Sequence, residues 1–140
     1  MKIYNQIKLA QELIRFPTVK TEDKGIMKFL SRKLSSIGFR CKIIKSKGIG
    51  QKSALNLYAK YGNSKRHINF LGHTDVVANL NNWKIPPFKG VVRKGYLNGR
   101  GSQDMKGGIA CFISAISKFI KNNKFKGSIS IIIAADEETT

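Results

Sequence analysis

The feature that most constrains the fold is an almost continuously apolar run at residues 129–135, with four isoleucines and two alanines. A run of this length and composition is typical of a strand that is covered on both faces. Strand-like and helix-like segments alternate along the rest of the chain. The sequence therefore predicts an α/β fold, a three-layer αβα sandwich with a mixed, largely parallel sheet.

The spacing of apolar residues defines the other expected elements. It predicts a helix over about residues 4–15 that Pro17 ends, and a second helix that follows cap residues 21–23 and stops at Gly38. A longer amphipathic helix is expected over residues 105–120. Shorter extended segments are expected as strands at residues 40–45, 55–59 and 68–71, with a loop at 48–50 and a hairpin turn at Lys94-Gly95.

Acidic residues are scarce and unevenly placed. The 140 residues, enough for one ordinary domain, include 8 Asp and Glu against 26 Lys and Arg. Five of the eight acids lie in three short segments, residues 72–75, 99–108 and 136–138. Because acidic residues are rare in the rest of the chain, their concentration in these three segments indicates that the segments have a chemical function.

The formal net charge of +18 has two readings. It can attract nucleic acid, anionic membranes or acidic small molecules, or it can simply follow from a lysine-rich composition whose charges are spread along the chain. The sequence carries neither a nucleic-acid motif nor a signal peptide nor a run of about 20 apolar residues. We therefore expect a cytoplasmic chain without membrane or specific nucleic-acid partners.

A metal site formed by all three acidic segments is the interpretation that explains them together. His73 and Asp75 follow one expected strand, Glu137 and Glu138 follow another, and Asp104 opens a helix. Strand ends of a parallel sheet meet at one edge, where ligands gather. A histidine oriented by a carboxylate, a bridging carboxylate, and a ligand beside a general base are what a two-metal hydrolase needs.

Each segment also has a plainer reading. His73 alone is more often a hydrogen-bonded or solvated histidine, and Asp104 in a glycine-rich turn is a common helix cap. The pair Glu137 and Glu138 can be a solvated acidic turn. The only other histidine, His67, precedes the first segment and is expected to be structural or exposed.

Six motifs follow one another in order along essentially the whole chain. They are Arg15-Phe16-Pro17-Thr18, Gly72-His73-Thr74-Asp75-Val76-Val77, Trp83 with Pro86-Pro87-Phe88, Tyr96-Leu97-Asn98-Gly99-Arg100-Gly101, Asp104-Met105-Lys106-Gly107-Gly108 and Ala135-Asp136-Glu137-Glu138.

Together these motifs resemble those of the metal-dependent aminoacylase and carboxypeptidase family. The resemblance implies that His73 and Glu138 each bind one of two Zn²⁺ or Co²⁺ ions and that Asp104 bridges them. It further implies that Asp75 orients His73, that Glu137 is the general base, and that the peptide bond after Asp104 is cis.

The resemblance also implies a zinc-exopeptidase-like catalytic domain, of which residues 1–140 would be the N-terminal part. Family members are longer, with further metal ligands and a second domain through which they form homodimers, so the 140-residue chain is expected to be truncated and inactive alone. The implied reaction is hydrolysis of N-succinyl-L,L-2,6-diaminopimelate to succinate and diaminopimelate, in lysine and diaminopimelate biosynthesis. The alternatives are a related deacylase that acts on another small anionic N-acyl amino acid, such as acetylornithine, or a non-enzymatic basic fragment that binds anions or nucleic acid non-specifically.

Overall fold

A computed structural model describes residues 2–47, 53–78 and 81–138, so the loop expected at residues 48–50 lies outside the described part. The elements follow the expected order, with bounds that differ by a few residues. They are α1 (Gln6–Ile14), α2 (Ile26–Ser35), β1 (Arg40–Lys47), β2 (Ser53–Tyr61), β3 (His67–His73), β4 (Val91–Arg93), β5 (Tyr96–Asn98), α3 (Lys106–Asn122) and β6 (Ser128–Ala134).

Local signals in the sequence explain where α2 begins and ends. The Asp23 carboxylate accepts hydrogen bonds from the backbone N–H groups of Gly25 and Met27, at 2.8 and 3.1 Å. These bonds satisfy donors that the first turn of a helix leaves without a partner. At the other end Gly38 has a φ of 93°, a conformation that glycine adopts without steric cost. The predicted cap and the predicted stop are both confirmed.

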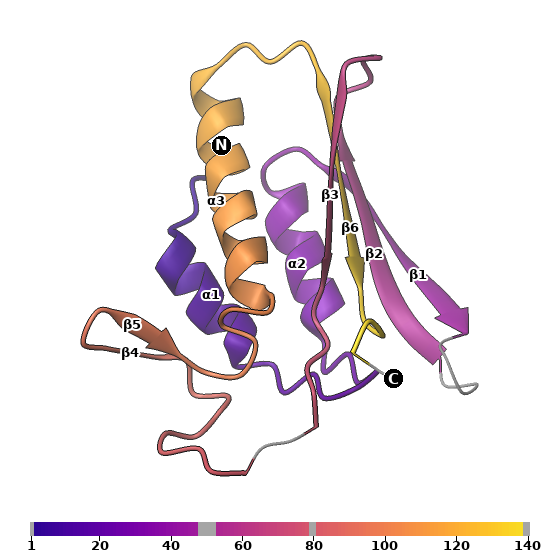
Figure 1. Ribbon diagram of the computed structural model, residues 1–140. Helices are drawn as coiled ribbons and strands as arrows, with labels where there is room; N and C mark the ends of the chain where they lie inside the picture. The colour runs from indigo at the N-terminus through magenta and orange to yellow at the C-terminus, as the bar shows by residue number, and fades with distance from the viewer. Residues whose placement is uncertain (1, 48–52, 79–80, 139–140) are drawn as a thin grey trace.

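The main sheet has four strands in the order β1-β2-β6-β3, and Figure 1 shows β6 between β2 and β3. β3 and β6 run parallel, whereas β1 pairs with β2, and β2 with β6, in antiparallel fashion. The α/β class and the mixed sheet are confirmed. The expectation of a largely parallel sheet is wrong for the described strands, because apolar spacing specifies a strand but not the direction of its neighbour.

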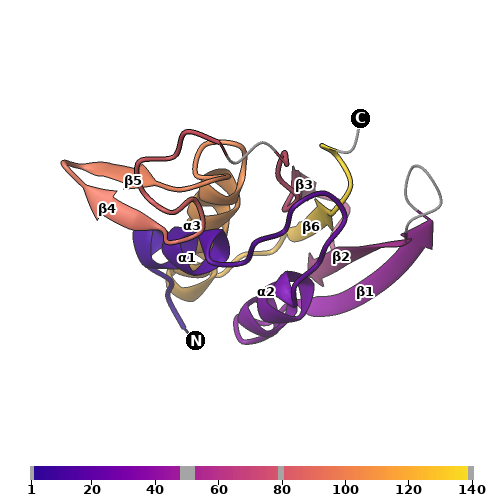
Figure 2. The same ribbon diagram turned by 90° about the horizontal axis from the view of Figure 1, so that it is seen from below.

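All three helices lie on one face of this sheet, as Figures 1 and 2 show from two directions. Their apolar sides pack on the inward residues of the central strand, Ile129, Ile131 and Ile133, to form the core. On the opposite face Ile132 is 37% exposed and Leu71 is 64% exposed. No described helix covers that face, so the described part of the chain forms two layers of the predicted three.

The fold brings three chain segments to one end of the sheet. Parallel pairing aligns His73, the last residue of β3, with Ala134, the last residue of β6. The first turn of α3 lies at the same end, close to the hairpin formed by β4 and β5 (Figure 1). Among the described residues, no helix is long and apolar enough to span a membrane.

Two adjacent glycines in the first turn of α3 give a matched test of the packing. A Cβ at Gly107 would overlap the carbonyl oxygen of Ser102, whereas a Cβ at Gly108 would meet nothing closer than Met105 Cε at 4.0 Å. Gly107→Ala should therefore lower the free energy of unfolding by about 1–3 kcal/mol through overpacking. Gly108→Ala should raise it by about 0.4–1 kcal/mol, because alanine favours the helix.

Chemical denaturation of the two variants and the parent chain measures both effects. Equal effects of the two substitutions would contradict the close approach of Ser102 to Gly107.

Candidate metal centre

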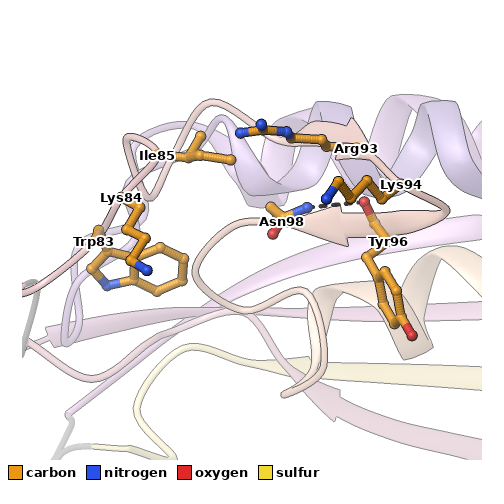
Figure 3. A pocket seen from close by; sticks show the side chains of 7 residues that line it. All are labelled: Trp83, Lys84, Ile85, Arg93, Lys94, Tyr96 and Asn98. Carbon is orange, nitrogen blue, oxygen red and sulfur yellow. Dashed lines mark hydrogen bonds between the residues drawn. The ribbon is translucent and has the colours of Figure 1, made fainter.

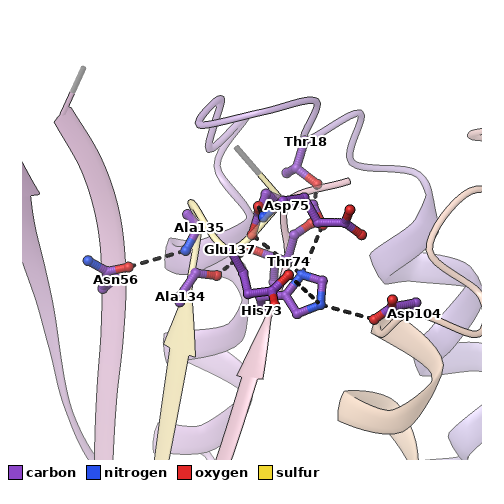
Figure 4. Close-up of polar contacts among 10 residues, drawn as sticks. Thr18, Asn56, His73, Thr74, Asp75, Asp104, Ala134, Ala135 and Glu137 are labelled. Carbon is purple, nitrogen blue, oxygen red and sulfur yellow. Dashed lines mark hydrogen bonds and ion pairs between the residues drawn. The ribbon is translucent and has the colours of Figure 1, made fainter. Parts of the chain in front are cut away.

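His73 lies at the centre of the polar cluster. It ends β3, and its ring is buried, with a residue exposure of 6%. Nδ1 lies 3.1 Å from the backbone oxygen of Asp75, and Nε2 lies 3.0 Å from Oδ1 of Asp104 and 3.8 Å from Oε2 of Glu137. Figure 4 shows the ring between these groups. One nitrogen is therefore held by the backbone, while the other faces two carboxylates.

Asp75 is fully buried and connects the two strand ends. Its Oδ2 accepts a hydrogen bond from the backbone N–H of Glu138 at 2.6 Å, and its Oδ1 lies 3.4 Å from Nδ1 of His73. Within the described residues Oδ1 has no hydrogen-bond partner, although it is buried. Asp75 thus contacts both the ring of one candidate ligand and the backbone of another, the position of an orienting residue.

Three side chains offer ligand atoms around one point. His73, Asp104 and Glu138 each present an atom within 4.8 Å of the other two. The Asp104 side chain is 72% exposed, so this group faces the opening of the site. One imidazole nitrogen and carboxylate oxygens are a donor set that zinc accepts. The three residues predicted as metal ligands lie together, and the peptide bond between Asp104 and Met105 is cis, as expected.

The surroundings of the site raise the pKa of two of these groups, His73 and Glu138. Burial alone would lower the pKa of His73, but the hydrogen bond to Asp104 and the charge of Asp75 raise it above its ordinary value. Burial raises the pKa of Glu138, and the negative charge of Asp104 raises it further, while His73 opposes the change. Crowded carboxylates that resist ionisation are expected where a cation completes a site.

Two hydrogen bonds between Thr18, in the segment after α1, and the loop that carries Asp75 form a clamp on that loop. The buried Thr18 hydroxyl donates a hydrogen bond to the Thr74 carbonyl at 2.5 Å, and the Thr18 carbonyl accepts one from the Val76 N–H at 3.0 Å. Figure 4 shows Thr18 directly above this loop. The motif of residues 15–18 was part of the family resemblance, but this positioning contact was not foreseen.

A buried lysine holds the same segment from the other side. Lys106 is fully buried in the first turn of α3, and its Nζ donates to the Phe16 carbonyl at 2.7 Å. Burial lowers the pKa of Lys106 to about 8, and the charge of Asp75 opposes this shift. The motif of residues 104–108 therefore contributes a buried packing contact through Lys106 as well as a candidate metal ligand, Asp104.

A cavity of about 520 Å³ opens beside the cluster, and Asp104 and Glu138 line it. Trp83 forms another wall, and the Arg100 guanidinium lies 5.2 Å from the centre of its ring. Trp83 also borders a second cavity, of about 360 Å³. Figure 3 shows Lys84, Arg93 and Lys94 around it. One cation, Arg100, therefore lines the cavity beside the acidic cluster, and three more line the neighbouring cavity that Trp83 also borders.

His67 is not brought to this cluster. It begins β3, six residues before His73, and its ring nitrogens contact the hydroxyls of Ser128 and Ser130 at 2.7 and 2.8 Å. The expectation that it is structural is in agreement with these contacts.

Several curated sequences similar to this chain carry the same name. Succinyl-diaminopimelate desuccinylase of Pelagibacter ubique is 47% identical over 99% of this chain, and that of Ehrlichia canis is 45% identical over 94%. The matched region is 37% of the first relative and 35% of the second. The chain thus spans little more than a third of the length of these relatives.

Solved structures share the fold at low sequence identity. Human carnosine dipeptidase 1 superposes with a TM-score of 0.86 at 22% identity, over 96% of this chain and 32% of that one. An M20 family metallo-carboxypeptidase from Sulfolobus solfataricus gives 0.82 at 19% identity, over 98% and 32%. The family model for peptidase family M20/M25/M40 matches residues 70–140, just over half of the chain and the half that holds every acidic segment. The chain belongs to peptidase family M20/M25/M40.

Proposed function

We propose that the cluster binds two divalent metal ions and serves the hydrolysis of an amide bond. The observation that carries the proposal is the meeting of His73, Asp104 and Glu138, whose ligand atoms lie within 4.8 Å of one another although they come from three distant segments. His73 and Glu138 would each bind one ion, and Asp104 would bridge the two. Zinc and cobalt both suit such nitrogen and oxygen ligands.

In this proposal the metal ions polarise the scissile carbonyl when they are bound. The residues of the chain do the rest. Asp75 holds the Nδ1 side of His73, so that Nε2 faces the site. Glu137, whose Oε2 lies 3.8 Å from Nε2 of His73, takes a proton from the attacking water as general base and returns it to the leaving amine. Its side chain is 63% exposed, so water and substrate can reach it.

We further propose N-succinyl-L,L-2,6-diaminopimelate as the substrate, and lysine and diaminopimelate biosynthesis in the cytoplasm as the setting. Relatives 47% and 45% identical carry the name of that desuccinylase. The substrate has several carboxylates. Arg100 lines the cavity beside the cluster, and Lys84, Arg93 and Lys94 line the neighbouring cavity that shares Trp83 with it. Cationic walls of this kind concentrate anionic substrates.

The roles of the two neighbouring glutamates can be separated by substitution. Glu137→Gln should leave the metal content near normal but lower kcat about 10²–10⁴-fold, because it removes only the base. Glu138→Gln should lose or weaken one metal ion, since a neutral amide is a poor ligand. Metal analysis of the chain and succinate release from a chimera measure these effects. In the chimera, residues 1–140 replace the corresponding part of the Pelagibacter ubique relative.

Glu22→Gln is the control, because Glu22 is an exposed acid that pairs with Lys24 and does not belong to the cluster. Metal loss in Glu137→Gln together with full metal content in Glu138→Gln would show that the two roles are exchanged. A chimera that prefers acetylornithine would contradict the substrate but not the site.

Substitutions of Thr18 test whether its hydrogen bonds to the loop of Asp75 position the metal ligands. Thr18→Val keeps the shape of the side chain but leaves the buried Thr74 carbonyl without its hydroxyl partner, whereas Thr18→Ser retains the bond. Thr18→Val should weaken zinc affinity about 10-fold or more, on the scale of other orienting contacts, and Thr18→Ser should restore most of it. Competition with a chelator measures the affinity. Equal affinities in all three proteins would exclude a positioning role.

Metal affinity should also rise with pH. His73 and Glu138 have raised pKa values and therefore keep their protons to a higher pH than ordinary side chains. Both must lose a proton to bind a metal, so protons compete more strongly as the pH falls. Titration of the chain with zinc between about pH 5.5 and 8 should show the affinity falling toward the acidic end. An affinity that is constant over this range would contradict the assignment of these ligands.

A further inference from the structure

A third cavity lies at the end of the sheet opposite the candidate metal centre. Its volume is about 860 Å³, larger than the 520 Å³ of the cavity beside Asp104. It opens where β3 and β6 begin, and these strands each run for seven residues before they reach the cluster. A strand rises about 3.3 Å per residue, so roughly 20 Å separate the two sites. The cavity is therefore a different site from the proposed catalytic centre.

Close backbone contacts hold the two loops that form this cavity. A Cβ at Gly62 would overlap the carbonyl oxygen of Gly127, so the loops before β3 and β6 touch directly. The Ser128 N–H donates to the Arg66 carbonyl at 2.8 Å, and the Ser128 hydroxyl donates to the Ser64 carbonyl at 2.8 Å. These bonds fix the two loops relative to each other.

Three cations converge on the cavity. Lys65 and Arg66 come from the loop before β3 and Lys126 from the loop before β6, and all three are exposed. None of them forms an ion pair with a described acid. The acids of the chain are elsewhere, at the metal centre or near α1 and α2. Three like charges are thus held together without a counter-charge, an arrangement that an anion would stabilise.

The remaining lining indicates which anion fits. The Ser64 hydroxyl oxygen accepts a hydrogen bond from the Arg66 N–H at 3.2 Å, which leaves its own O–H available as a donor. Phe125 lines the cavity but is half-buried and packs against Phe119 and Tyr61, so its ring is not free to stack on a base. An arginine fork, two ammonium groups and a hydroxyl suit phosphate oxygens.

We infer that this cavity binds a phosphate chain. The ligand is a flexible oligophosphate, either a free polyphosphate or the backbone of a single-stranded nucleic acid, and it is recognised by charge and hydrogen bonding without base readout. The inference does not depend on the proposed hydrolytic function, because no residue of the metal cluster takes part.

The test compares two charge-matched triple variants of the chain. One carries Lys65→Gln, Arg66→Gln and Lys126→Gln. The control carries Lys8→Gln, Lys28→Gln and Arg32→Gln, three exposed cations on α1 and α2 that lose the same net charge. Tripolyphosphate and a 20-residue oligothymidylate serve as probes, in metal-free buffer at about 100 mM salt. Titration calorimetry and fluorescence anisotropy measure the affinities, and thermal unfolding checks that both variants fold.

The cavity variant should lose at least about 10-fold in affinity, and the control less than about 3-fold. A cavity-dependent loss for both probes identifies the phosphate chain itself as the ligand. A loss for tripolyphosphate alone identifies free polyphosphate as the ligand, and a loss for oligothymidylate alone identifies single-stranded nucleic acid. Equal losses in the two variants would overturn the inference, because binding would then follow the net charge of +18. Absence of binding to the parent chain, or equally tight binding of polyglutamate, would also overturn it.

Discussion

The parallel pairing of β3 with β6 is the interaction on which the rest of the structure depends. It joins His67 to Ser128 at one end and His73 to Ala134 at the other. The Thr74 N–H continues the ladder with a hydrogen bond of 2.9 Å to the Ala134 carbonyl, and the Asn56 side chain holds the Ala135 N–H from the other side. A slip of one residue would turn every side chain of β3 to the opposite face and move His73 away from Glu138. The same ladder brings the two basic loops together at its start.

The cluster of acids lies in a chain that otherwise carries a strong positive charge, and buried polar contacts hold it in place. Asp75 is fully buried, and only one of its oxygens has a hydrogen-bond partner among the described residues. Lys106 is also fully buried; burial lowers its pKa to about 8, and the charge of Asp75 opposes this shift. Thr18 and Lys106 then fix the segment that packs against the loop of Asp75. We infer that this layer of buried contacts keeps the exposed ligands in position, since exposed acids alone would repel one another.

Local patterns in the sequence were sufficient to predict the helices and strands and to identify the candidate ligands. The start and the end of α2 were predictable from Asp23 and Gly38, because a helix cap and a left-handed turn depend only on neighbouring residues. The candidate ligands His73, Asp104 and Glu138 were predictable because their motifs lie at the ends of expected strands and at the start of an expected helix. Strand direction was not predictable, because it depends on a neighbour distant in sequence. For this reason the antiparallel pairing of β2 with β6 was missed. The third layer expected over Ile132 is not formed by the described residues. The Thr18 clamp was missed because its partner lies 56 residues away. The basic cavity was missed because β3, the hairpin of β4 and β5, and α3 separate Arg66 from Lys126 in the sequence.

The central claim is that His73, Asp104 and Glu138 hold divalent metal at the carboxyl ends of β3 and β6. The most direct measurement is anomalous diffraction at the zinc edge from crystals of the chain grown with zinc. The account predicts anomalous density about 2.0–2.2 Å from Nε2 of His73 and from carboxylate oxygens of Asp104 and Glu138. Density at His67 with none at this cluster, or a cluster that stays empty at saturating zinc, would contradict it.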